Sequence, residues 1–152
     1  MPAVTPLTTF SSMPDPTFYD FVSQHPDGSW TASPKSLDDT TVTDPMFGNS
    51  VHLGVKSILK KKVEDFGNKQ IAQIALPAVQ IAANTTIAQL SAIPPGSLTP
   101  AQSSQLSAAQ ALTNKIQATN NYAHQEMIHI DSLMTFDACM AWVMPTGWPS
   151  VV

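Results

Sequence analysis

Residues 70–114 decide the fold, and they read QIAQIALPAVQIAANTTIAQLSAIPPGSLTPAQSSQLSAAQALTN. This neutral segment contains no charged side chain and no histidine. About a quarter of the residues of a soluble domain are normally charged, so a free surface of this length should carry about ten charges. Their absence suggests a surface that meets protein rather than bulk water, as is typical of a component of an assembly.

Two long helices are predicted on either side of a break at Pro94-Pro95-Gly96. The first covers about 51–93, where apolar residues recur every three or four positions, and Pro77 should kink or interrupt it. The second covers about 100–143. It opens on Thr99-Pro100-Ala101-Gln102, which combines a capping box with proline in the first helical position.

Apolar residues in the second helix recur at heptad spacing, which indicates a coiled-coil seam. The oligomer seam that we predict consists of Leu106, Ile116, Asn120, Met127, Ile130 and Met134. A short connection makes the two helices antiparallel neighbours. The expected fold is therefore mainly α, a long antiparallel helical hairpin in a coiled-coil-like oligomeric bundle.

Residues 1–50 are expected to form an extended, irregular arm. They carry seven prolines, and six aspartates against one lysine give them a net charge of -5. Pro26-Asp27-Gly28 indicates a turn between two short extended pieces, 17–24 and 29–33. The arm is rich in aromatic residues, which suggests anchors for pockets on a partner. The anchors predicted in the arm are Phe18, Tyr19, Phe21, Trp30 and Phe47.

An apolar tail, 145–152, follows the second helix. Trp148 in this tail and Trp142 just before it are the remaining predicted partner-binding residues. Two alternatives stand for the tail, which either folds back on the open end of the hairpin or anchors the chain to a partner. Residues 51–69, at net +3, are either a solvated helix face or a dock for the acidic arm of the same or a neighbouring copy.

The composition argues against several functional classes. All seven basic residues are lysines, and specific reading of bases or phosphates relies on arginine. We therefore expect no specific nucleic-acid partner. Residues 71–93 are too polar for a single membrane span, and the first twenty residues lack the pattern of a signal peptide. The single cysteine, Cys139, reads as a small buried hydrophobe.

No catalytic, cofactor-binding or metal-binding residues are predicted. The best cluster is His124, Glu126, His129 and Asp131, in which Glu126 and His129 have the E-x-x-H spacing of carboxylate-bridged di-iron bundles. Such a site needs several glutamates, and the chain has only two. No nucleophile elbow, Walker loop or dinucleotide fingerprint is present. We expect a protein that is not an enzyme.

The combination of arm, low charge and neutral helices resembles minor virion proteins of tailed bacteriophages, such as tail, baseplate, collar or fibre-attachment subunits. The resemblance implies a structural subunit of the virion that locks neighbouring subunits together, with copies of itself and other structural proteins as partners. Two alternatives remain, a cytoplasmic helical adaptor or chaperone-like binding module and a membrane-active helical hairpin.

Overall fold

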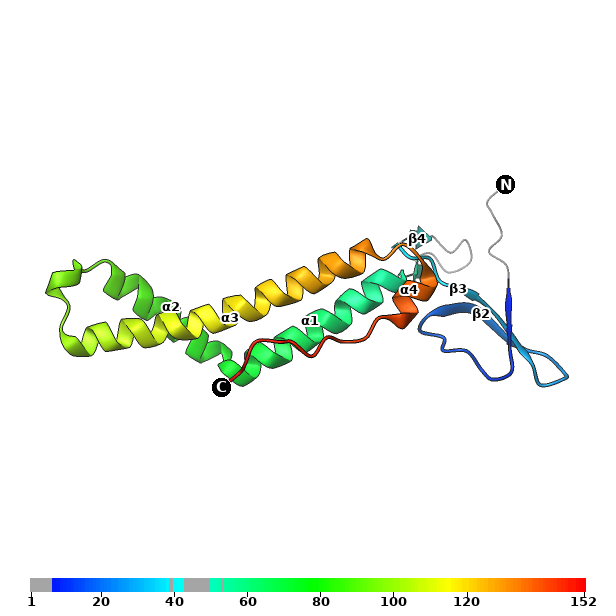
Figure 1. Ribbon diagram of the computed structural model, residues 1–152, viewed down its shortest axis with the longest axis horizontal. Coiled ribbons are helices and arrows are strands. Elements are labelled where there is room, and N and C mark those ends of the chain that lie inside the picture. Colours follow the sequence, from blue (N-terminus) through cyan, green and yellow to red (C-terminus); the bar gives the residue numbers. More distant parts are fainter. Residues whose placement is uncertain (1–6, 39, 43–49, 53) are drawn as a thin grey trace. The chain divides into compact units, whose positions relative to one another are not determined.

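The computed structural model describes residues 7–38, 40–42, 50–52 and 54–152. The protein is mainly helical, as the sequence predicts (Figure 1). The described elements are β1 (Thr8–Phe10), β2 (Tyr19–Gln24), β3 (Trp30–Pro34), β4 (Thr40–Val42), β5 (Ser50–His52), α1 (Val55–Ile74), α2 (Pro77–Ser91), the 3-10 turn η1 (Pro95–Ser97), α3 (Pro100–Ser132) and α4 (Phe136–Ala141).

The chain divides into two compact units. Unit 1 combines Met1–Lys60 with Ile130–Trp142, and unit 2 combines Lys61–His129 with Val143–Val152. Helices α1 and α3 each contribute residues to both units.

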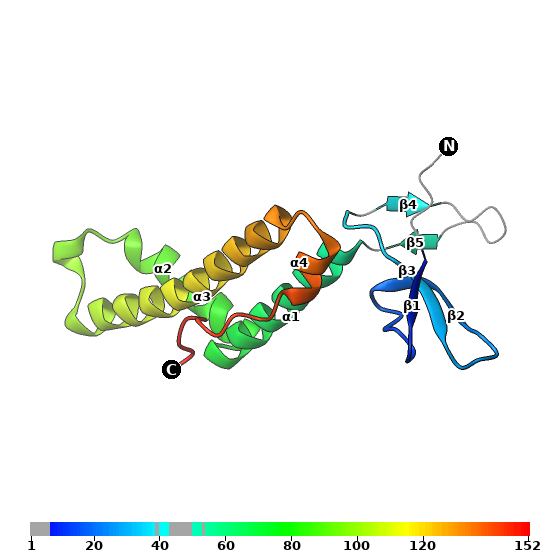
Figure 2. The same ribbon diagram turned by 45° about the vertical axis from the view of Figure 1, so that its right-hand side comes forward.

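An antiparallel sheet with strand order β1-β3-β2 occupies much of the predicted arm (Figure 2). The predicted turn is confirmed between β2 and β3, where His25 N–H donates to the Ser29 carbonyl at 2.8 Å. Gly28 takes the left-handed conformation, with φ 85°. The Asp27 carboxylate accepts hydrogen bonds from Ser29 N–H and Oγ, at 2.9 and 2.6 Å, which fixes the turn locally.

The prediction of an irregular arm is wrong for residues 7–38. It rested on the prolines, but these lie where a sheet tolerates them. Pro14 and Pro16 lie between β1 and β2, Pro26 lies in the turn, and Pro34 is the last residue of β3. A proline in these places removes no central ladder hydrogen bond, so it does not prevent pairing.

The first helix begins at Val55 rather than near residue 51, because residues 50–52 form β5 and pair with β4. Its first amide groups donate to the chain that leaves β3. Val55 N–H binds the Ser36 carbonyl at 2.8 Å, and Lys56 N–H binds the Leu37 carbonyl at 3.1 Å. These bonds satisfy donors that have no partner inside the helix, and they fix the start of α1 to the sheet in unit 1.

Lys56 also connects the start of α1 to the end of α3. Its Nζ donates to the Asp131 carbonyl at 3.0 Å and lies 3.8 Å from the Asp38 carboxylate. Asp131 is the penultimate residue of α3, where a cation is favoured by the helix dipole. Lys60 Nζ donates to the carboxylate of the same Asp131 at 2.8 Å. The core of unit 1 lies beside these contacts and includes Phe18, Ala32, Val55, Leu59, Ile130 and Cys139.

Pro77 divides the first predicted helix into α1 and α2, which confirms the expected interruption. Leu76 before it is extended, with φ -65° and ψ 155°, as the proline ring requires of its neighbour. The two helix axes are bent by 69°. The Gln80 side-chain amide donates to the Ala75 carbonyl at 2.8 Å, so one carbonyl freed at the end of α1 is satisfied.

The predicted capping box at the start of α3 is confirmed. Thr99 N–H donates to the Gln102 side-chain oxygen at 2.9 Å, and Gln102 N–H donates to Thr99 Oγ1 at 3.2 Å. The helix ends at Ser132, so the predicted continuation to about residue 143 is wrong. Thr135 starts a new helix, α4, because its Oγ1 accepts from Ala138 N–H at 3.1 Å as an N-cap.

Phe21 is a strained residue on the edge strand β2. Its φ is 54°, in the left-handed region, and the register of β2 with β3 shifts between Asp20 and Ser23. This irregularity turns the ring outward, and 79% of Phe21 is exposed. A non-glycine residue costs about 1–2 kcal/mol in this conformation, and Phe21 recovers little of that by burial.

We expect Phe21→Gly to raise the free energy of unfolding by up to about 1 kcal/mol, because glycine adopts the left-handed conformation without strain. Chemical denaturation measures it. Phe21→Ala is the control, since alanine keeps the strained conformation and removes the ring. A loss of stability with glycine that matches or exceeds the loss with alanine would contradict this account.

Candidate assembly interface

Helix α2 is the least covered helix of unit 2. Its fifteen residues include no charged side chain, and Ala83 alone among them is buried. Apolar side chains at and near its start face outward instead. Leu76, Val79 and Ile81 are exposed by 65%, 49% and 67%. An uncharged helix that buries so little within its own chain is a candidate contact surface.

The first half of α3 completes the neutral segment. Residues 100–114 carry Gln, Ser, Thr and Asn as their polar side chains, and only Ala109 among them is buried. Leu106, Leu112 and Thr113 are half-buried. The candidate interface therefore consists of α2, η1 and α3 up to Asn114, ending where Lys115 restores charge.

The predicted oligomer seam falls into three groups. Ile130 is buried in unit 1. Leu106, Ile116 and Met127 are half-buried, whereas Asn120 is exposed and Met134 is 80% exposed. The residues of α3 that are buried within the chain are Ala109, Thr119, Ala123 and Ile130. Asn120 and Met134 stay exposed in the single chain, and the seam itself stays a prediction.

The predicted aromatic anchors likewise include buried, half-buried and exposed residues. Phe18 is buried, and Tyr19 makes edge-to-face contacts with Phe10 and Phe136, at centroid distances of 5.1 and 5.3 Å. Trp30 and Trp142 are half-buried, Phe21 is exposed, and Phe47 lies outside the described residues.

Trp148 packs on its own chain in unit 2. Its ring centroid lies 5.0 Å from that of Phe66 and 4.9 Å from that of Tyr122. Of the two alternatives for the tail, this packing matches folding back onto the helices. Whether any of these aromatic residues binds a partner stays a prediction.

In the described part of the chain, the cluster of His124, Glu126, His129 and Asp131 does not come together as a metal site. His129 Nδ1 and Glu126 Oε1 lie 3.1 Å apart, so the E-x-x-H pair forms one local contact. Asp131 accepts from Lys60 instead, in unit 1. Within the described ranges, no group of three or more His, Cys, Asp or Glu side chains is arranged to hold a metal ion.

A shallow cleft of about 280 Å³ lies between α1 and α3 in unit 2. Its floor is made of Gly67 and Ala123, which are both buried. Around the floor lie Glu64, Asn68, Asn120, His124 and Met127. The sequence pattern did not predict this cleft. The available signal was the small residue Gly67 within a helical pattern, which often marks a close approach of two backbones.

Neither a family model, nor a curated protein, nor a solved structure matches this chain. Among the described helices, none is by itself long and apolar enough to cross a membrane. The pair α1 and α2 meets the length and composition test together, with its 69° bend between them.

Cys139 is almost fully enclosed in unit 1, with 1% of its surface exposed. Burial raises the pKa of its thiol, the nearby Lys56 ammonium lowers that pKa, and the Asp38 carboxylate raises it. The net shift is upward, so the reactive thiolate is scarcer at neutral pH than in a free cysteine. This environment agrees with the interpretation of Cys139 as a core residue.

We expect Cys139 in the folded protein to react with iodoacetamide much more slowly than in urea at pH 7.5. The rate should continue to rise with pH beyond the point where it levels off in urea, because the folded pKa is raised. Mass spectrometry of timed samples measures both effects. Equal rates in folded and unfolded protein would show that the thiol is accessible and contradict the packing.

Proposed function

We propose that this protein is a non-enzymatic structural subunit of a large assembly, in which copies associate through the neutral segment. The observation that carries the proposal is the surface of α2, which has no charge, buries only Ala83 and exposes Val79 and Ile81. Exposing apolar side chains to water is unfavourable, so covering the apolar part of this surface with protein lowers the free energy.

A second copy of the same chain fits this surface chemically. In a two-fold contact, each surface patch meets the same patch of the partner, so like charges would face each other. The neutral segment avoids that repulsion, because its polar side chains are amides and hydroxyls. These groups both donate and accept hydrogen bonds, so a face that carries them is complementary to itself.

The architecture that we propose for the assembled subunit is an antiparallel helical hairpin within an oligomeric bundle. The cleft between α1 and α3 brings residues 64–68 beside 120–127, which supports neighbouring helices in unit 2. Asn120 and Met134, both exposed in the single chain, would then lie in the seam between copies. Asn120 would specify register, and Met134 would supply adaptable packing.

We propose a tailed-bacteriophage virion as the assembly, with this chain as a tail, baseplate, collar or fibre-attachment subunit. The support is the combination of a low share of charged residues, 12%, with an uncharged helical surface and an aromatic-rich N-terminal region. A helical adaptor differs from this proposal in solution, because it would be a monomer that binds transiently. The mass of the purified protein therefore separates the two.

We expect the purified protein to form a stable oligomer, and a glutamate in α2 to reduce its mass in light scattering. Val79→Glu and Ile81→Glu are made separately, because residues two apart point to opposite sides of a helix. The variant that dissociates the oligomer identifies the covered side.

Met13→Glu is the matched control, since it places the same charge at an exposed apolar residue outside the helices. A monomeric wild type, or an unchanged mass in both α2 variants, would remove the proposed interface.

The membrane-active alternative is kept because α1 and α2 together pass the test of length and composition for a bent span. Liposome flotation at neutral pH decides it. We expect the protein to remain in the dense fraction, because polar side chains recur throughout α2 and each would be buried at a cost in lipid. Recovery with the floating vesicles would instead favour the alternative.

A further inference from the structure

The segment 143–152 contains no helix or strand, and both ribbon views show it running alongside α1 (Figures 1 and 2). The chain passes from unit 1 to unit 2 at its start, between Trp142 and Val143. Val143 is 77% exposed, so its side chain does not fix this junction.

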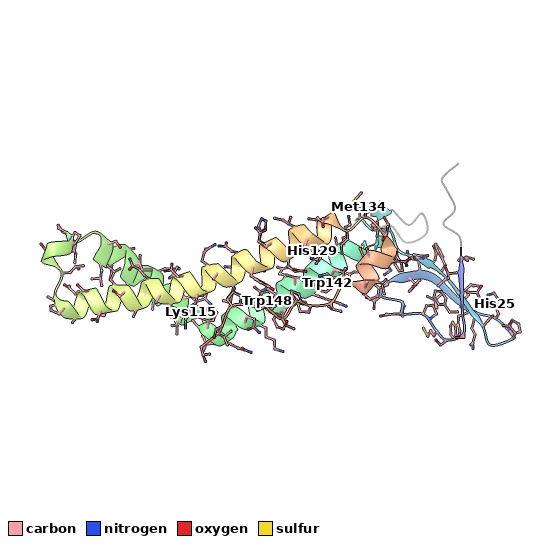
Figure 3. The ribbon with its side chains drawn as sticks, viewed as in Figure 1. His25, Lys115, His129, Met134, Trp142 and Trp148 are labelled. Carbon is pink, nitrogen blue, oxygen red and sulfur yellow. The ribbon has the colours of Figure 1, made fainter. Side chains whose placement is uncertain are left out.

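One side chain seats this segment on the helices of unit 2. Trp148, which Figure 3 labels, occupies a slot with Phe66 and Tyr122 as its walls and the bare backbone of Gly67 as its floor. A Cβ placed on Gly67 would lie 3.5 Å from the Trp148 ring and 3.5 Å from Ala123 Cβ. The slot therefore has room for one methyl group at this position, in ordinary contact with both neighbours.

Gly147 lets the backbone enter the slot. A Cβ placed on it would lie 3.0 Å from the Tyr122 hydroxyl, closer than an ordinary contact. Pro149 follows the tryptophan and stiffens the exit. The sequence Gly-Trp-Pro thus has the form of a short recognition motif, with an extended backbone and one large aromatic anchor.

Polar contacts do not hold the segment in place. The hydrogen bonds of residues 143–152 are local ones between Ser150 and Val152. Trp148 Nε1 is buried without a hydrogen-bond partner. Leaving a buried donor unsatisfied opposes the gain from burying the ring. The packing of Trp148 in the slot therefore depends on apolar contact alone. No backbone hydrogen bonds between this segment and the helices have to break when the segment leaves.

We propose that the slot formed by Phe66, Gly67, Tyr122 and Ala123 also accepts the segment 143–152 of a second copy, so that neighbouring subunits exchange tails. The same atoms would meet in both cases, so the direct contact is equal within a chain and between chains. Exchange of an identical element is a low-cost route to association for this reason.

The balance between the two forms depends on local concentration. Within one chain the segment is tethered to its own slot, which corresponds to an effective concentration of about millimolar for a short flexible link. Exchange competes when neighbouring copies are held together at a similar local concentration. In this respect the inference rests on the proposed function, because the α2 contact would bring the copies together.

A mixing experiment with two full-length variants tests the exchange. Gly67→Ile fills the slot but keeps an intact Trp148, whereas Trp148→Ala keeps an open slot but lacks the anchor. Neither variant alone has both an intact tail and an open slot. In the mixture, the tail of Gly67→Ile can enter the slot of Trp148→Ala. Native mass spectrometry separates the pairs by mass. We expect heterodimers in excess of the number that random pairing gives.

Gly67→Ala is the matched control, because one methyl group fits the slot, and its mixture with Trp148→Ala should show no such excess. If Gly67→Ile loses helicity by circular dichroism, Tyr122→Ala replaces it, since it removes one wall and leaves the contact between Gly67 and Ala123. Random pairing, or no pairing, in the mixture would overturn the exchange.

The same data keep this inference apart from the proposed function. Association through α2 gives homodimers and heterodimers in random proportion, and the α2 variant that dissociates the wild-type oligomer, Val79→Glu or Ile81→Glu, should abolish it. An excess of heterodimers that persists when both variants also carry that α2 substitution reports tail exchange alone. Random pairing that disappears with that α2 substitution supports the α2 contact and overturns the exchange.

Discussion

Unit 1 depends on the pairing of the buried Lys56 side chain with Asp131 and Asp38. Only 9% of this lysine is exposed, and its Nζ must therefore be paired. It is satisfied by the Asp131 carbonyl at the end of α3 and faces the Asp38 carboxylate beyond the sheet. One side chain thus ties together three parts of the chain, 38, 56 and 131, that are far apart in sequence. Part of the expected docking of the acidic arm on the basic residues is observed here, within one chain.

The neutral segment poses the opposite physical problem. Lys56 is a charge that had to be enclosed, whereas α2 is an uncharged helix that its own chain leaves largely uncovered. A helix with so little burial gains little stability from tertiary packing, which normally supplies most of it. Contact with another copy would supply that packing. The structural role proposed here and the stability of α2 therefore have the same physical origin.

The aromatic residues show why composition alone misjudged the N-terminal region. Prolines and polar residues indicated an arm that could not bury enough apolar surface to fold. Pairing of β1, β2 and β3 overcame that deficit, because Tyr19 could contact Phe136 from a part of the chain more than a hundred residues away. Phe18 and Tyr19 were predicted to be anchors for a partner, but Phe18 is buried and Tyr19 packs against Phe10 and Phe136. For these two, the surface belongs to the same chain.

The sequence by itself determined the local features. The capping box at Thr99, the interruption at Pro77 and the turn at Gly28 each follow from residues within four positions of one another, so no distant contact could change them. Only the tertiary structure decided the Trp148 slot, the capping of α3 by Lys56 and the cleft over Gly67 and Ala123. Each of these joins residues more than fifty positions apart, and a periodic pattern does not record which helix faces meet.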